Sequence, residues 1–351
     1  MNLTAGFAEN VISARARAMY GHTLTYEDYE ALLACHSVSE VAAYLKNETV
    51  YHEVLSDINE ATIHRGYLES RLRRRMWDNY ATLMRFDMSA GNRLSDYLMM
   101  REETGQIMRL LRRMNVGRAQ DYILSTPAFF EGHSKLDYIA VNRAADMAQL
   151  VAALAGTPYQ KLLAPFAELP NGTLPLTDIE TALYGALVER LLSVIHQTSG
   201  SLRQELTDLC GTQIDVQNVT RVLRLKTYFH AQPAEIRPHL LPAGGTIPQH
   251  AWERLLAADA EELPELFFAT RAGRRVPPAH RPYLYDLPIR ATYFTARHYM
   301  HFSVHPMVVL LSYLIIMDTE VMDLTNIIEG IRYQLPPEEI KPMLVLGMER
   351  M

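Results

Sequence analysis

The stretch DLTNIIEGIRYQLPPEEI, residues 323–340, contains the pattern that decides the fold. Its apolar residues Leu324, Ile327 and Ile331 are three and four positions apart, which is the spacing of one face of an amphipathic α-helix. The two prolines that follow are a signal for the end of that helix. The segment therefore predicts a helix with one packing face.

Two other segments align with the start of this stretch over ten residues without gaps, Glu103–Arg112 (ETGQIMRLLR) and Asp215–Arg224 (DVQNVTRVLR). The acids at 103, 215 and 323 follow one another at intervals of 112 and 108 residues. Further fragments recur near one or two such intervals, namely Thr49/Tyr51 with Thr157/Tyr159, YEALLA (29–34) with WERLLA (252–257), LESRL (68–72) with IETAL (179–183), and PAEIRPHLL (233–241) with PEEIKPMLV (337–345). A common interval indicates a repeated structural unit.

The rest of the chain favours an all-α fold. Apolar spacings of three and four dominate, as in residues 26–45, 94–114 and 178–197, whereas alternation typical of strands is rare. Gly- and Pro-rich stretches at 168–176, 241–248 and 272–283 are expected to connect helices. We predict three pseudo-repeated helical domains of about 110 residues, with boundaries at 1–122, 123–241 and 242–351.

The polar residues of the three signature segments have a structural interpretation. Asp215 and Asp323 precede apolar helical runs, where a carboxylate N-cap can accept hydrogen bonds from free N–H groups. The arginines that end each segment are expected to pair with an acid on another helix or with a helix C-terminus. The structural or interface positions are Glu103, Gln106, Arg112, Asp215, Asn218, Arg224, Asp323, Asn326 and Arg332.

Composition excludes several classes of protein. The chain has 351 residues, 48% of them hydrophobic, so it can bury a large core. A net charge of −6 disfavours nucleic-acid binding, which requires clustered excess Lys and Arg. One basic run, Arg71, Arg73, Arg74 and Arg75, has no counterpart in the other predicted units, and it is either a solvated helix face or a contact with an acidic partner.

Two cysteines, Cys35 and Cys210, are too few and too distant in sequence for a disulfide framework, so we expect small buried side chains in a reducing compartment. The N-terminal segment lacks the apolar core of a secretory signal. The most apolar stretch, residues 307–317, is much shorter than the roughly 20 residues that span a bilayer. A protein without a membrane span is therefore expected.

Motifs for catalysis are missing from the sequence: it contains no phosphate loop, dinucleotide fingerprint, HExxH or nucleophile elbow. We therefore expect no catalytic residue and no cofactor. The strongest enzyme-like pattern is RHYMHFSVH, because His298, His301 and His305 would share one face if a single helix carried them and could then bind zinc. The alternative is that these imidazoles lie at a helix surface or in a seam between helices.

The signature at Asp323–Ile340, its relatives at 103 and 215, the early Arg-rich helix and the pair Thr49/Tyr51 resemble the C-subunit family of V/A-type ATPases (V-type ATP synthases), whose eukaryotic counterpart is the d subunit of the vacuolar proton pump. The resemblance covers essentially the whole chain. It implies three helical domains arranged as a pseudo-threefold funnel, present in one copy on the cytoplasmic face of the membrane proteolipid (c/K) ring. It further implies that the funnel receives the central shaft, formed by the D and F subunits, and couples ATP turnover to proton or sodium transport without catalytic residues.

Two alternatives remain open at this stage. One is a stand-alone α-helical repeat adaptor that binds an unrelated cytosolic partner, and the other is a metal-dependent hydrolase that uses the three histidines.

Overall fold

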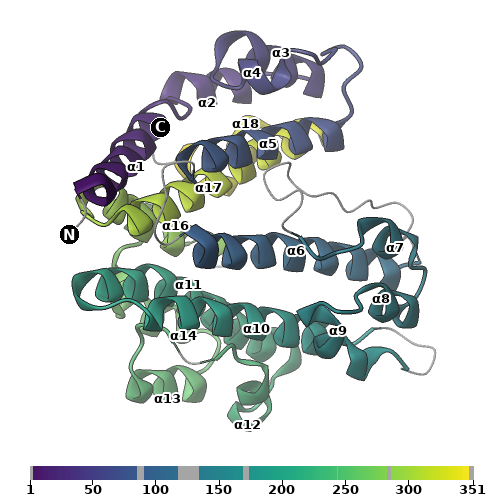
Figure 1. Ribbon diagram of the computed structural model, residues 1–351, viewed down its shortest axis with the longest axis vertical. Helices are drawn as coiled ribbons and strands as arrows, with labels where there is room; N and C mark the ends of the chain where they lie inside the picture. Colours follow the sequence, from purple (N-terminus) through teal and green to yellow (C-terminus); the bar gives the residue numbers. More distant parts are fainter. Residues whose placement is uncertain are drawn as a thin grey trace. The chain divides into compact units, whose positions relative to one another are not determined.

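The computed structural model describes residues 3–84, 91–117, 134–168, 174–242, 244–282 and 286–347. These residues form eighteen α-helices and a few 3-10 turns, and none of them is in a strand (Figure 1). The prediction of an all-α fold is confirmed. The helices fall into two compact units, which comprise Met1–Ser89, Gly200–Thr220 and Gly245–Met351 in unit 1, and Ala90–Ser199 and Arg221–Gly244 in unit 2.

The three-part division at 122 and 241 stays a prediction. Two of the three predicted helical stretches are single helices. Residues 94–114 lie in α6 (Gly91–Asn115), and residues 178–197 correspond closely to α10 (Leu176–His196). Residues 26–45 contain two helices, α2 (Tyr26–Leu33) and α3 (Val38–Glu48), because Ser37 caps the second by accepting a hydrogen bond from Glu40 N. The expected connection at 272–283 includes part of α15 (Arg271–Arg274) and the whole of η5 (Pro278–His280). Some residues of the three expected connections lie outside the described residues, namely 169–173, 243 and 283.

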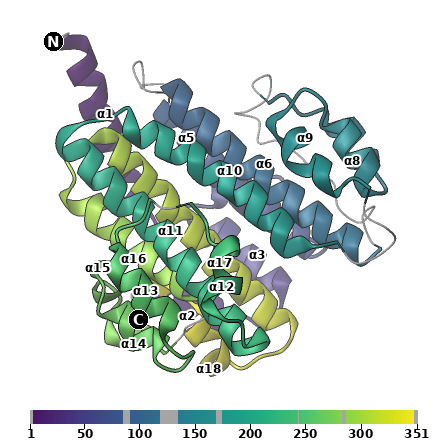
Figure 2. The ribbon, with the colours of Figure 1, turned by 90° about the horizontal axis from the view of Figure 1, so that it is seen from below.

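Unit 1 is built around α17 (Pro306–Arg332), which is buried on nearly all sides. It packs along α16 (Leu287–Phe302), and α1 (Leu3–Gly21) and α5 (Arg65–Met84) cover further faces (Figure 2). Each fully buried Leu or Ile contributes about 1.5–3 kcal/mol relative to exposure. The apolar stretch 307–317 thus forms the core of a helix bundle, and no helix in the described part of the chain has the length and apolarity needed to cross a membrane.

Two clusters of short helices complete unit 1. The first, α2, α3 and α4 (His52–Leu55), packs on α17. The second comprises α13 (Gln249–Ala257), α14 (Leu263–Phe268) and α15, and it packs on α16 through α15. The C-terminal segment adds α18 (Pro337–Ile340) and η7 (Lys341–Met343).

Unit 2 has two long helices, α6 and α10, that lie side by side (Figure 1). The short helices α7 (Tyr138–Arg143), α8 (Met147–Ala153) and α9 (Pro158–Leu163), with η3 (Ala164–Phe166), surround a shared apolar core with them. α11 (Gly200–Phe229) contributes residues up to Thr220 to unit 1 and the remainder to unit 2, where α12 (Pro233–Ile236) and η4 (Arg237–His239) follow.

Both cysteine thiols are free. Cys210 is buried as expected, and burial raises its pKa to about 12. Cys35 is only half-buried, so the expectation of two buried side chains holds for one of them.

Candidate functional site: buried carboxylates on the long helices

Asp323 lies in the middle of α17 and is completely buried. Its two carboxylate oxygens accept hydrogen bonds from the backbone N–H groups of Val345, Leu346 and Gly347, at 2.8, 2.8 and 3.1 Å. Burial raises the pKa of Asp323 to about 7, against the lowering effect of these three donors. One carboxylate therefore anchors the C-terminal segment against the central helix of unit 1.

Asp215 has the same kind of role on α11. Its Oδ2 accepts hydrogen bonds from the backbone N–H groups of Thr246 and Ile247, at 2.5 and 3.0 Å, and from the Thr246 hydroxyl at 2.8 Å. Burial raises the pKa of Asp215 to about 6. A Cβ atom at Gly245 would overlap the carboxylate, so the glycine permits the close approach of this segment. The segment leads directly into α13.

Glu103, on α6, accepts from side chains instead of backbone groups. Its carboxylate accepts hydrogen bonds from the hydroxyl of Ser134 at 2.5 Å and from that of Tyr159 at 2.7 Å. Burial raises its pKa, as for the two aspartates. Ser134 lies just before α7 and Tyr159 lies in α9, so Glu103 connects a long helix of unit 2 to its cluster of short helices.

The interpretation of Asp215 and Asp323 as N-caps of their own helices is wrong. α11 begins after Ser199 and α17 begins after His305, so both aspartates lie well inside their helices. The apolar spacing continues upstream of each acid, and the helix continues with it. Each carboxylate accepts its hydrogen bonds from backbone N–H groups that lie more than 20 residues further along the chain.

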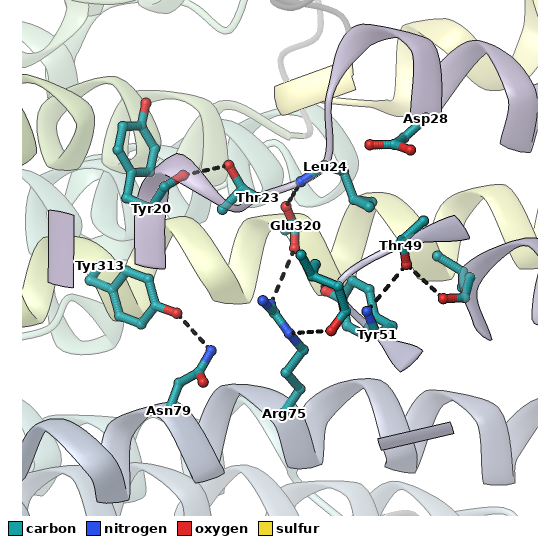
Figure 3. A network of polar contacts seen from close by, with 12 residues as sticks. Tyr20, Thr23, Leu24, Asp28, Thr49, Tyr51, Arg75, Asn79, Tyr313 and Glu320 are labelled. Atoms are coloured by element: carbon teal, nitrogen blue, oxygen red, sulfur yellow. Dashed lines mark hydrogen bonds and ion pairs between the residues drawn. The ribbon is translucent and has the colours of Figure 1, made fainter. Parts of the chain in front are cut away.

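Glu320, one turn before Asp323, holds a second buried network in unit 1 (Figure 3). Its carboxylate accepts from the backbone N–H of Leu24 at 2.9 Å and from the Tyr51 hydroxyl at 2.8 Å. Burial, with the neighbouring Glu320 carboxylate, raises the pKa of Tyr51 well above its ordinary value of 10. Since Leu24 precedes α2 and Tyr51 precedes α4, this acid fixes the first short-helix cluster on α17.

Arg75, from α5, provides the positive charge of this network. Its guanidinium lies 4.0 Å from Glu320 and 4.9 Å from the centre of the Tyr51 ring, and its Nε donates to the Val50 carbonyl at 3.2 Å. Beside it, Asn79 donates to the Tyr313 hydroxyl at 2.8 Å (Figure 3). A buried carboxylate requires such compensation, because an unpaired charge in a low-dielectric interior is costly.

The two Thr-x-Tyr pairs have similar contacts. The Thr49 and Thr157 hydroxyls each donate to the carbonyl at the end of the preceding helix, Leu45 O and Leu154 O, both at 2.7 Å. Tyr51 and Tyr159 each donate to a buried carboxylate. These pairs therefore fix short helices in place.

Asp208, on α11, is a further buried acid of unit 1. Its Oδ2 accepts from Tyr299 at 2.6 Å, from Arg275 at 2.5 Å and from Arg271 at 3.2 Å. Sequence reasoning missed both Asp208 and Glu320. The available signal was an acid at an apolar register of a long helix, where a charge is costly unless a specific partner compensates it.

The remaining signature positions have individual contacts. Arg112 lies 3.5 Å from Glu180 on α10, as expected for pairing with another helix, whereas Arg332 pairs with Glu329 of its own helix at 3.4 Å. Asn326 donates to Met343 O at 3.0 Å, and Gln106 donates to Glu102 at 3.1 Å. Asn218 is buried on α11, and Arg224 lines a small recess with Glu180 and His239.

The basic run divides into inward and outward residues. Arg75 belongs to the buried network, and Arg71 pairs with Asp57 and lies over the Tyr67 ring. Arg73 and Arg74 are exposed, and Arg74 lies 3.5 Å from Asp78. A partner contact by this run stays a prediction, and Arg73 and Arg74 are the residues placed to make it.

The premise of the histidine hypothesis is wrong, because a single helix does not carry all three residues. His298 and His301 lie in α16, which ends at Phe302, whereas His305 occupies the position just before α17. The His301 ring packs edge-on against Tyr20, and His305 Nε2 lies 2.9 Å from the Ser201 hydroxyl. Among the described residues, no group of three His, Cys, Asp or Glu side chains is arranged for a metal ion.

These contacts define an α-helical protein in which buried carboxylates on long helices hold clusters of short helices in place. The family model described as ATP synthase (C/AC39) subunit matches residues 12–343. The chain belongs to this family, which confirms the resemblance inferred from its sequence.

Similar proteins are named as C subunits of A-type ATP synthases. The C subunit of the A-type ATP synthase of Archaeoglobus fulgidus is 23% identical over 252 residues, 72% of this chain and 70% of the relative. The protein of the same name from Thermococcus onnurineus is 25% identical over 236 residues, which are 67% of this chain and 61% of that relative. The one from Methanosarcina mazei is 25% identical over 345 residues, 95% of this chain and 91% of the relative.

Proposed function

We propose that this protein is a non-catalytic part of the central rotor of a V/A-type ATP synthase. In this role one copy per complex joins the central shaft, formed by the D and F subunits, to the membrane proteolipid (c/K) ring on its cytoplasmic face, and so couples ATP turnover to proton or sodium transport. The observation that carries the proposal is the family match over residues 12–343, together with relatives that are each named as the C subunit of an A-type ATP synthase.

The buried carboxylates support a mechanical role. A part that transmits torque must keep its shape, and the buried hydrogen bonds of Glu103, Asp215 and Asp323 fix short segments against long helices. Each buried hydrogen bond contributes about 0.5–1.5 kcal/mol, and about 1.5–3 kcal/mol where the acceptor is ionised. We propose that this rigidity, and not any reactive group, is what the chain supplies to the complex. We further propose that the three units of about 110 residues predicted from the sequence surround the end of the shaft.

Purification from native membranes tests the proposed assembly. A tagged chain, extracted in mild detergent, is expected to bring down the D and F subunits and the proteolipid in a fixed ratio, with one copy of the chain per complex. A tagged, unrelated helical protein expressed at the same level is the control. Recovery of the chain without shaft or ring proteins would contradict the proposal and favour the stand-alone adaptor.

Reconstitution tests the coupling role. Membrane vesicles depleted of the chain are expected to lose ATP-driven ion uptake, while the catalytic head still hydrolyses ATP. Adding back the purified chain should restore uptake. The isolated chain should hydrolyse no ATP, and retention of full uptake by depleted vesicles would refute the role in coupling.

A further inference from the structure

The second short-helix cluster of unit 1 contains a groove to which nothing above assigns a role, although Thr246, Ile247 and Arg271 in its lining also bond to Asp215 or Asp208. It lies between α13 and the corner where α14 meets α15, and its volume is about 340 Å³. Ile247, Leu255 and Leu266 contribute an apolar floor, with small side chains between them. The groove can therefore accept several apolar atoms of a ligand, with no hydrogen-bonding demand from its floor.

The rim of the groove is cationic. Arg254 on α13 and Arg271 and Arg274 on α15 line it, together with His250, and no acidic side chain is among the described residues that line it. This composition contrasts with a chain whose net charge is −6. In the described part of the chain, no carboxylate lies within ion-pair distance of Arg254 or Arg274, whereas Arg271 shares Asp208 with Arg275.

The backbone holds Arg274 in position. The Thr270 hydroxyl caps α15 by accepting from Gly273 N at 3.2 Å, and Arg274 donates to Ala269 O at 2.8 Å. A Cβ atom at Gly273 would lie 2.6 Å from Phe268 Cα, so only glycine lets α15 approach α14 this closely. Two of the three arginines, Arg271 and Arg274, are thus held at the corner by specific hydrogen bonds.

The first short-helix cluster provides an internal comparison. The fragment YEALLA in α2 matches WERLLA in α13, and Arg254 stands where Ala31 does. Ala31 also lines a groove, of about 370 Å³, between α2 and α3, but the charged residues there are Glu40 and Glu48. The positive charge of the α13 groove is therefore specific to the second cluster and is not a general property of such helix pairs.

We propose that the groove between α13 and α15 binds an acidic amphipathic helix of a partner protein. Apolar residues of that helix fill the floor, and its carboxylates pair with Arg254, Arg271 and Arg274, since guanidinium groups bind carboxylates in two-point geometry. A free phosphate ion fits less well, because the floor of the groove is apolar. The proposal rests on this groove alone and does not depend on the role in the rotor.

Peptide binding by the full chain tests the proposal. The probe is a fluorescent synthetic peptide of about four helical turns with leucine on one face and glutamate on the other, and a lysine version is its counterpart. The intact chain is expected to bind the glutamate peptide and to bind the lysine peptide at least about tenfold more weakly. Salt at about 0.5 M should weaken the first interaction, because rim charges are screened.

Charge reversal provides the matched variants. Arg254 is exposed, so Arg254→Glu should fold, and its circular dichroism and Tm should match those of the intact chain. It is expected to lose about tenfold in affinity for the glutamate peptide and to gain affinity for the lysine peptide. Arg143→Glu, which changes an exposed arginine on α7, is the control and should leave both affinities unchanged.

Several results would overturn the proposal. One is equal binding of the glutamate peptide by the intact chain and the Arg254→Glu variant. Another is Arg254-dependent binding of inorganic pyrophosphate, or of phosphatidylglycerol vesicles, in the absence of peptide binding. The last two outcomes would identify the groove as a site for phosphate or for a lipid surface.

Discussion

Asp323 shows that a single carboxylate can fix the position of a whole chain segment. It is fully buried in α17, in a stretch that is otherwise mostly apolar, and three backbone donors converge on it. The signature around it could be found in the sequence, and so could its importance for the fold. Its partners could not, because residues 345–347 carry no pattern that identifies them as donors to a side chain 22 positions earlier.

Replacing Asp323 tests this anchor. Asp323→Ala should lower the free energy of unfolding by about 3–5 kcal/mol, because three buried N–H groups lose their acceptor. Asp323→Asn keeps the volume and one acceptor oxygen and should cost about 1–2 kcal/mol. Urea denaturation followed by circular dichroism measures both, and an alanine variant as stable as the intact chain would refute the role of the carboxylate.

The pH dependence of stability provides a second prediction for Asp323. Its folded pKa of about 7 lies above the ordinary 3.8, so between these values the folded chain holds a proton that the unfolded chain has lost. The contribution of Asp323 to stability must therefore fall as pH rises from about 4 to about 7. The stability of the intact chain relative to Asp323→Asn should decrease over that interval and pass from higher to lower, measured by urea denaturation at each pH.

The comparison with Asp323→Asn is necessary because His280 acts in the opposite direction. Burial lowers the pKa of His280 to about 4 from its ordinary 6.5. Its contribution is present above about pH 6.5 and is lost as pH falls towards about 4. A difference between two chains that share His280 cancels this effect, and a difference that does not change with pH would contradict the shifted pKa of Asp323.

At the scale of elements, the length and amphipathic spacing of α6 and α10 were sufficient to predict them. The short helices were harder, since α4 and α15 have four residues each and four residues contain barely one helical repeat. Side chains far away in sequence decide where these helices lie. Tyr51, for example, is held by Glu320, which is 269 positions away.

A double-mutant cycle measures how strongly α4 depends on α17. Tyr51→Phe removes the hydroxyl and Glu320→Gln removes the charge that accepts it. Each variant should cost about 1.5–3 kcal/mol, and the double variant should cost less than the sum by about 1–2 kcal/mol. Strict additivity in denaturant unfolding would contradict a direct energetic coupling, and Glu338→Gln, which changes an exposed acid, should alter stability little.

At the scale of the whole molecule, composition and periodicity predicted an all-α protein, and the recurring signature led to the correct family. The three equal domains drawn from that recurrence stay a prediction. The structure divides into two compact units, and the first of them combines residues 1–89 with segments that begin at 200 and 245. Sequence intervals record how a pattern recurs, whereas compactness depends on which helices pack together.

The composition of unit 1 leads to a prediction about shortened chains. A chain that ends at residue 300 lacks Glu320 and the apolar faces of α17, so α2–α4 lose both their charged anchor and their packing surface. Amide hydrogens of residues 26–55 should then exchange at least about a hundredfold faster than in the full chain, measured by mass spectrometry. Unchanged protection would indicate that this cluster folds without α17.

The hydrogen bond from Leu24 to Glu320 also has a consequence for how the protein is made. Leu24 leaves the ribosome nearly 300 residues before its acceptor, and at about 5–20 residues per second this interval lasts some tens of seconds. Throughout that time the apolar surface that α17 covers on α1, α2, α3 and α5 has no permanent partner. We expect chaperones to bind this surface until α17 has been synthesised, and we expect a chain that stops before α17 to be degraded by proteases. Because this bond joins an early residue to a late one, it can form only near the end of synthesis.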